Sequence, residues 1–153
     1  MAEIGIEGPR SLREDLLIKL VRQLAARDTT VAVAIDDPTA TIDRAHKDTG
    51  RHQAAGAVLT LGSSPHHSSL IGKRTADEPV DAFLPHMGNA EVILISEQDI
   101  SPRKTRLVIQ AGAPDTEDTV TLHGSGGAIA TSSLADIDAI AGLVTHHLNG
   151  PTS

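Results

Sequence analysis

The sequence predicts an α/β fold built on a largely parallel sheet. Two segments near the ends of the chain have the apolar spacing of amphipathic helices, and short apolar runs rich in β-branched residues lie between them. Two of these runs, Val31–Ile35 and Val92–Ile95, are apolar without alternation. Strands covered on both faces have this pattern, and a strand–helix–strand order favours parallel pairing.

The first helix is predicted from Leu12 to about Ala26. Leucines and a valine recur there every three or four residues and form one apolar stripe. Ser11 could cap this helix, because Glu14 follows three residues later and completes a capping-box pattern.

The predicted strands are all short. Thr105–Ile109 and the segment around Ser69–Gly72 are expected to add antiparallel strands at an edge of the sheet. The other predicted strands, in chain order, are Ala2–Ile6, Thr30–Ile35, Ala57–Leu61, Glu91–Ile95 and Gly127–Ala130.

The second helix is predicted between Leu134 and Leu148, where apolar residues again form one stripe. Ser133 could cap it, and Gly150 with Pro151 would stop it. Together these elements predict one domain over residues 1–150 and a tail over residues 151–153.

Composition excludes several classes of function. The chain has 20 acidic and 13 basic residues, so its net charge of −7 does not attract nucleic acid or anionic membranes. Phe83 is the only aromatic residue, which argues against a base-stacking surface, and the lack of cysteine excludes thiolate chemistry. Adjacent histidines such as His66 and His67 point apart, so no metal site is expected. With no long apolar run and an acidic start, we expect a cytoplasmic protein.

The segment from Glu7 to Arg13 follows a predicted strand and opens a helix, as a phosphate-binding loop would. Such a loop needs glycines, a lysine and a hydroxyl side chain, but Arg13 stands at the lysine position and Glu14 at the hydroxyl position. Arg10, Ser11 and Arg13 could still hold one anion at the helix start, although the neighbouring carboxylates would oppose it. An ordinary helix start is therefore favoured over triphosphate binding.

A second polar cluster lies between residues 43 and 57. Lys47, Arg51 and His52 could converge on a phosphate or carboxylate, with Asp48 orienting one of them. On spacing alone, a solvated helical turn with local ion pairs is favoured over a binding cluster, because charge clusters are usually solvated faces. A further basic group, Arg103 with its neighbours, could face a partner or lie in a solvated loop.

The motif Lys47-Asp48-Thr49-x-Arg51-His52-x-x-Ala55-Gly56-Ala57, followed by a strand, resembles the molybdopterin-guanine dinucleotide biosynthesis protein B (MobB) family. The order of the other predicted elements agrees with this family along nearly the whole chain. The resemblance implies a P-loop NTPase-like fold, with a mostly parallel sheet flanked by helices. It also implies a homodimer that binds GTP with Mg²⁺ and acts as an adapter beside the guanylyltransferase, whose bound substrate is molybdopterin.

Several positions depart from the family pattern. The family's Gly-Lys-Thr-Thr is replaced by Leu12-Arg13-Glu14-Asp15, and its Glu-Gly after the strand at 92–95 by Ser96-Glu97. The resemblance therefore implies a divergent member with a vestigial nucleotide site and a GTPase activity that is very weak or absent, without catalytic residues. The residues assigned to the vestigial site are Gly8, Arg10, Ser11 and Arg13, and those assigned to phosphate or cofactor binding are Lys47, Asp48, Arg51 and His52.

Two other functions stay open at this point. The chain could be a pseudo-nucleotidase that acts only as an interaction module, docking on the guanylyltransferase or on a molybdoenzyme. It could also be a small enzyme that acts on a phosphate ligand, with His52 as its acid or base.

Overall fold

The computed structural model describes residues 2–36, 55, 59–72 and 80–150. The chain forms two compact units, one made of Met1–Asp36 with Phe83–Ser153 and the other of Asp37–Ala82. Each is considered by itself.

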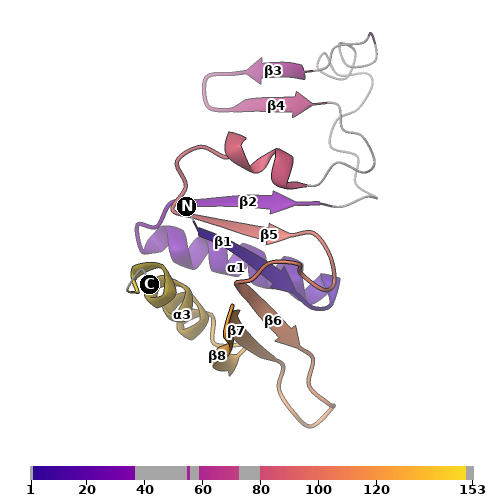
Figure 1. Ribbon diagram of the computed structural model, residues 1–153, viewed down its shortest axis with the longest axis vertical. Helices are drawn as coiled ribbons and strands as arrows, with labels where there is room; N and C mark the ends of the chain where they lie inside the picture. Colours follow the sequence, from indigo (N-terminus) through magenta and orange to yellow (C-terminus); the bar gives the residue numbers. More distant parts are fainter. Residues whose placement is uncertain (1, 37–54, 56–58, 73–79, 151–153) are drawn as a thin grey trace. The chain divides into compact units, whose positions relative to one another are not determined.

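The larger unit contains a six-stranded sheet with the strand order β2-β5-β1-β6-β7-β8 (Figure 1). Four neighbouring strands are parallel, and two antiparallel strands complete the sheet at one end. The predicted α/β class and mostly parallel sheet are thus confirmed. The parallel strands are β1 (Ala2–Glu7), β2 (Val31–Ile35), β5 (Val92–Ser96) and β6 (Arg106–Gln110), and the antiparallel strands are β7 (Thr119–Gly124) and β8 (Gly127–Ser133).

The antiparallel strands are not the ones that the sequence predicted. The predicted edge strand at Thr105–Ile109 is β6, which lies inside the sheet, parallel to β1 and antiparallel to β7. The segment at Ser69–Gly72 belongs to the smaller unit, where β4 (Ser68–Gly72) pairs only with β3 (Leu59–Ser63) among the described strands. Its pairing is antiparallel as expected, but it adds nothing to the six-stranded sheet.

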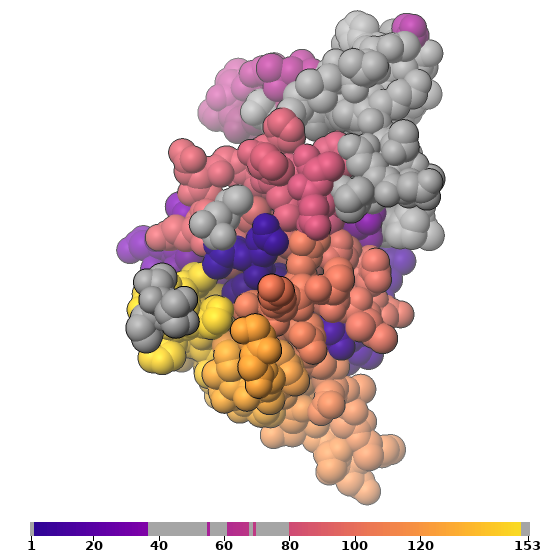
Figure 2. Space-filling view, in the orientation of Figure 1, coloured from indigo at the N-terminus to yellow at the C-terminus, as the bar shows by residue number. Residues whose placement is uncertain are grey.

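Two helices, α1 (Arg10–Ala26) and α3 (Ile137–Asn149), pack against each other and share one core with the sheet (Figure 1). Alternate strand residues enter this core, including Ile4 and Ile6 of β1, which are fully buried. In β5, Ile93 and Ile95 are fully buried as well, as expected of a strand covered on both faces. Figure 2 shows the segment of residues 83–110 spread over much of the visible face of the larger unit.

Both predicted helix caps are wrong. Pro9, not Ser11, is the N-cap of α1, and no side chain caps the helix. Proline suits this place because its fixed φ fits the helix start and it has no N–H to leave unbonded. At α3, Asp136 accepts a hydrogen bond from Ala139 N at 3.1 Å, so the helix starts beyond Ser133, which ends β8.

The connection between β5 and β6 has to cross β1, because these two strands flank it. It does so without a helix, through residues 97–105, which we call the crossover loop. Ile4 and Ile6 face the helices, so Gly5 faces the other side, where the loop passes. A Cβ at Gly5 would lie 2.0 Å from Ser101 Oγ, so only glycine lets the loop come this close.

Two short 3-10 turns, η1 (Val80–Ala82) and η2 (Leu84–His86), precede β5. Among the helices in the described ranges, none is long and apolar enough to cross a membrane.

Replacing Gly5 by alanine is expected to destabilise the protein by about 1–3 kcal/mol, because Ser101 and the loop backbone must move away from the new methyl group. Urea unfolding followed by circular dichroism measures this change. Gly126→Ala is the matched control, since nothing lies within 4 Å of its Cβ position, and it should change stability by less than about 0.5 kcal/mol. Equal effects of the two substitutions would contradict the packing argument.

Candidate functional site

The carboxyl ends of β1, β2 and β5 meet at one edge of the sheet, because these strands are parallel and adjacent. Asp36 N, just after β2, donates a hydrogen bond to Ser96 O of β5 at 3.0 Å. In open parallel sheets, ligands bind at this edge. The two described segments that follow these ends are the β1–α1 connection and the crossover loop.

The β1–α1 connection consists of only Gly8 and Pro9. Gly8 has a φ of +138°, and a Cβ there would lie 2.8 Å from Ile109 Cβ, so the position requires glycine. Its N–H donates to Asp99 O of the crossover loop at 3.0 Å. Because Pro9 has no N–H, the connection's single amide hydrogen is already bonded within the chain.

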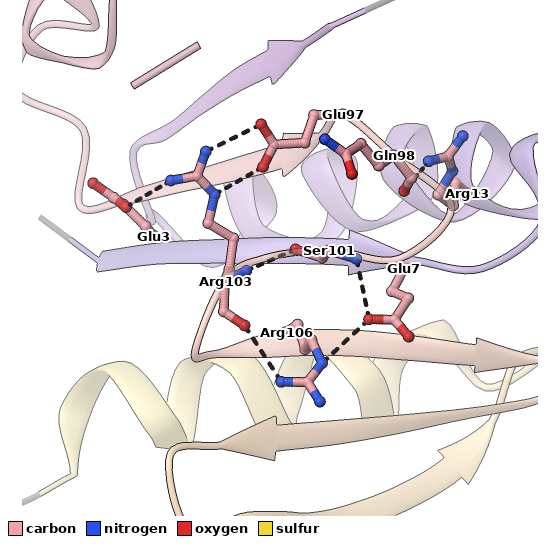
Figure 3. A network of polar contacts seen from close by, with 8 residues as sticks. All are labelled: Glu3, Glu7, Arg13, Glu97, Gln98, Ser101, Arg103 and Arg106. Atoms are coloured by element: carbon pink, nitrogen blue, oxygen red, sulfur yellow. Dashed lines mark hydrogen bonds and ion pairs between the residues drawn. The ribbon is translucent and has the colours of Figure 1, made fainter. Parts of the chain in front are cut away.

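Arg13 lies in the first turns of α1 with its side chain only 9% exposed. Its Nη1 donates to Gln98 O (Figure 3). Its Nη2 is 3.5 Å from Asp99 Oδ1, so the guanidinium is directed at the crossover loop. Arg13 Nε has no hydrogen-bond partner. Every other buried side-chain nitrogen or oxygen of the described residues has one. The residue at the family's lysine position therefore binds the protein's own backbone.

Arg10 and Ser11 lie at the start of α1 and are exposed. Arg10 Nε donates to Glu14 Oε1 at 3.1 Å, and this pair is open to solvent. The four residues of the vestigial site thus lie close together, as the sequence predicts for neighbours along the chain. Polar groups of three of them contact other groups of the chain: Gly8 and Arg13 contact the crossover loop, and Arg10 contacts the carboxylate of Glu14.

The crossover loop is held by an ion pair between Arg103 and Glu97. Arg103 Nε lies 2.9 Å from Glu97 Oε1 and its Nη2 lies 3.2 Å from Oε2, so the pair is bidentate (Figure 3). The two side chains are 10% and 8% exposed. Arg103 Nη1 also approaches Glu3 Oε2 of β1 at 3.4 Å. Glu97, which stands next to the family's acidic position, therefore forms an ion pair with Arg103 within the chain.

Glu7 at the end of β1 makes the second attachment of this loop. Its Oε2 accepts from Ser101 N at 3.2 Å and pairs with Arg106 Nε at 3.2 Å (Figure 3). Arg106 Nη1 in turn donates to Arg103 O at 3.3 Å. The basic group around Arg103, which the sequence left as a partner-facing or solvated loop, is thus largely neutralised within the chain.

Sequence reasoning missed the acidic half of this network. Glu3 and Glu7 alternate with the buried isoleucines of β1, which signals a strand face that carries charge opposite the core. Their partners lie about 100 residues later, at Arg103 and Arg106, so only the strand order brings them together.

Lys47, Asp48, Arg51 and His52 lie outside the described residues. Within the part of the chain that is described, no group of three or more histidine, aspartate or glutamate residues could hold a metal ion.

The family model of molybdopterin guanine dinucleotide synthesis protein B (MobB) matches residues 10–109. Two similar solved structures are both of Bacillus subtilis MobB. One has a TM-score of 0.54 at 16% identity over 75% of this chain and 71% of that chain. The other has a TM-score of 0.52 at 17% identity over 72% of this chain and 66% of that chain. No curated protein sequence matches the chain.

The chain belongs to the MobB family. The resemblance seen in the sequence is confirmed, and the mixed sheet with its flanking helices has the P-loop NTPase fold of MobB. Membership gives the chain a role in molybdenum cofactor biosynthesis. The family match starts at Arg10, the first residue of α1, so Gly8 and Pro9 lie outside it.

Replacing Glu97 by glutamine should lower stability by roughly 2–4 kcal/mol, because it removes the carboxylate that holds the buried Arg103 guanidinium in a bidentate pair. Glu14→Gln is the control: it removes an exposed charge pair and should cost about 0.5 kcal/mol or less. Urea unfolding of both variants gives the comparison. If Glu97→Gln proves as mild as Glu14→Gln, the loop does not depend on this pair.

Proposed function

We propose that this MobB-family chain is a non-catalytic adapter in molybdopterin guanine dinucleotide synthesis, acting by protein binding and without GTP at its β1–α1 connection. Family membership supports the pathway. The observation that carries the rest is the length of the connection, which is two residues, Gly8 and Pro9.

A phosphate-binding loop holds its ligand by curling several successive backbone N–H groups around the phosphate oxygens. Gly8 and Pro9 supply one N–H between them, and this one is bonded to Asp99 O. The side chains give no substitute, because Arg13 is directed at the crossover loop and Glu14 adds negative charge where magnesium would bind. Both facts favour an adapter over a GTPase.

The partner we propose is the guanylyltransferase that attaches GMP to molybdopterin, with a molybdoenzyme as the second candidate. GTP, Mg²⁺ and molybdopterin would then be bound by the partner. The cluster of Lys47, Asp48, Arg51 and His52 would contact the phosphate of the cofactor, because it combines cations with a residue that can orient them. We further propose that the adapter is a homodimer, as the family resemblance implies.

Titration calorimetry of the full chain with GTP, with and without Mg²⁺, should give no saturable heat up to high micromolar nucleotide. The reason is the missing N–H groups of the β1–α1 connection. Lys47→Ala provides the control, since any residual heat that it removes would arise at the second cluster. Micromolar, magnesium-dependent binding by the wild type would refute the proposal that the chain acts without GTP.

A guanylation assay tests the adapter role. Adding the chain to purified guanylyltransferase, molybdopterin and GTP should raise the rate of dinucleotide formation in a saturable way. Arg51→Ala should reduce this increase several-fold if the second cluster contacts the cofactor, whereas Arg22→Ala, on the α1 helix, should leave it unchanged. A rate that is the same with and without the chain would contradict the adapter role.

A further inference from the structure

We propose that Gln98 and Asp99 of the crossover loop form an internal substitute for a bound anion, and that Asp99 is the residue that excludes phosphate ligands from the start of α1. This inference rests on the proposed function, because it explains how the β1–α1 connection does without a ligand.

Three donors at the β1–α1 connection are matched by three acceptors on two successive loop residues. Gly8 N donates to Asp99 O at 3.0 Å, and Arg13 Nη1 donates to Gln98 O. Arg13 Nη2 lies 3.5 Å from Asp99 Oδ1. An amide N–H and a guanidinium at a helix amino end are the groups that bind phosphate in proteins, and here loop oxygens bind them instead.

The charge of Arg13 makes this match necessary. Its side chain is 9% exposed, and a buried cation without a compensating anion is costly. Among the described residues, Asp99 supplies the only carboxylate in contact with the guanidinium, and Gln98 supplies a neutral carbonyl. Asp99 therefore balances the charge that a phosphate would otherwise balance.

The loop that carries the acceptor oxygens of Gln98 and Asp99 is also attached to the rest of the unit. The Arg103–Glu97 pair and the hydrogen bond from Ser101 N to Glu7 attach the crossover loop on both sides of Asp99. A phosphate would have to displace a loop with its own buried ion pair, in addition to overcoming repulsion by the Asp99 carboxylate. The exclusion is therefore both steric and electrostatic.

The side chain of Asp99 is 83% exposed, so its replacement should leave the fold intact, although the lost charge balance at Arg13 should lower Tm in the absence of phosphate. We expect Asp99→Lys to bind inorganic phosphate about tenfold more tightly than the wild type, and Asp99→Asn about threefold more tightly. Phosphate-dependent shifts in Tm, measured against sodium chloride at the same ionic strength, report the binding. Asp115→Lys, which makes the same charge change in an exposed turn, should behave as the wild type does.

Two results would overturn the inference. In one, Asp99→Lys and Asp115→Lys gain the same phosphate response, so that only net charge matters. In the other, the gain of Asp99→Lys persists after Arg13→Gln is added, in a double variant shown by circular dichroism to be folded. Either result would contradict the role of Asp99 but not the proposed function. GTP binding by the wild type, in contrast, would contradict the proposed function itself.

Discussion

The arrangement of the larger unit depends on the crossover loop that passes over β1 at Gly5. Because β5 and β6 lie on opposite sides of β1, their connection must cross this strand, and here it does so as an extended loop close to the backbone. The bidentate pair of Arg103 and Glu97 fixes the loop in that position. The contacts of Gly8 with Asp99 and of Arg13 with Gln98 are possible only because the loop lies there.

This constraint changes the chemistry of the sheet edge where a P-loop protein would bind its ligand. In a phosphate-binding loop, the donors at the start of the first helix face solvent and have no partner within the chain until phosphate binds. In this chain the same donors are bonded to the oxygens of Gln98 and Asp99, and Glu7 is bonded to Ser101 and Arg106. Among the described residues, these donors are therefore bonded within the chain, apart from Arg13 Nε, which has no partner.

Sequence alone predicted the elements with strong local patterns and missed those that depend on tertiary context. The apolar runs gave β2 and β5 and the leucine stripe gave α1, with ends displaced by one or two residues. β7 was missed because Thr119–Gly124 alternates and is half buried, a weaker signal than a continuous apolar run. The closeness of Gly8, Arg10, Ser11 and Arg13 follows from chain neighbourhood, but the direction of the Arg13 side chain depends on Gln98, which is 85 residues away.

The two faces of β1 make different contacts. Ile4 and Ile6 face the helices and are fully buried in the shared core, whereas Glu3, Gly5 and Glu7 face the crossover loop. Substitutions on the loop face therefore leave in place the isoleucines that hold β1 in the centre of the sheet. In α1, Leu16, Leu20 and Leu24 are buried in the same core. A chain with Leu12, Arg13 and Glu14 at the family's phosphate-binding positions therefore retains the fold of its family. Under the proposed function, the anion beside Arg13 is the Asp99 carboxylate, whose Oδ1 lies 3.5 Å from Arg13 Nη2.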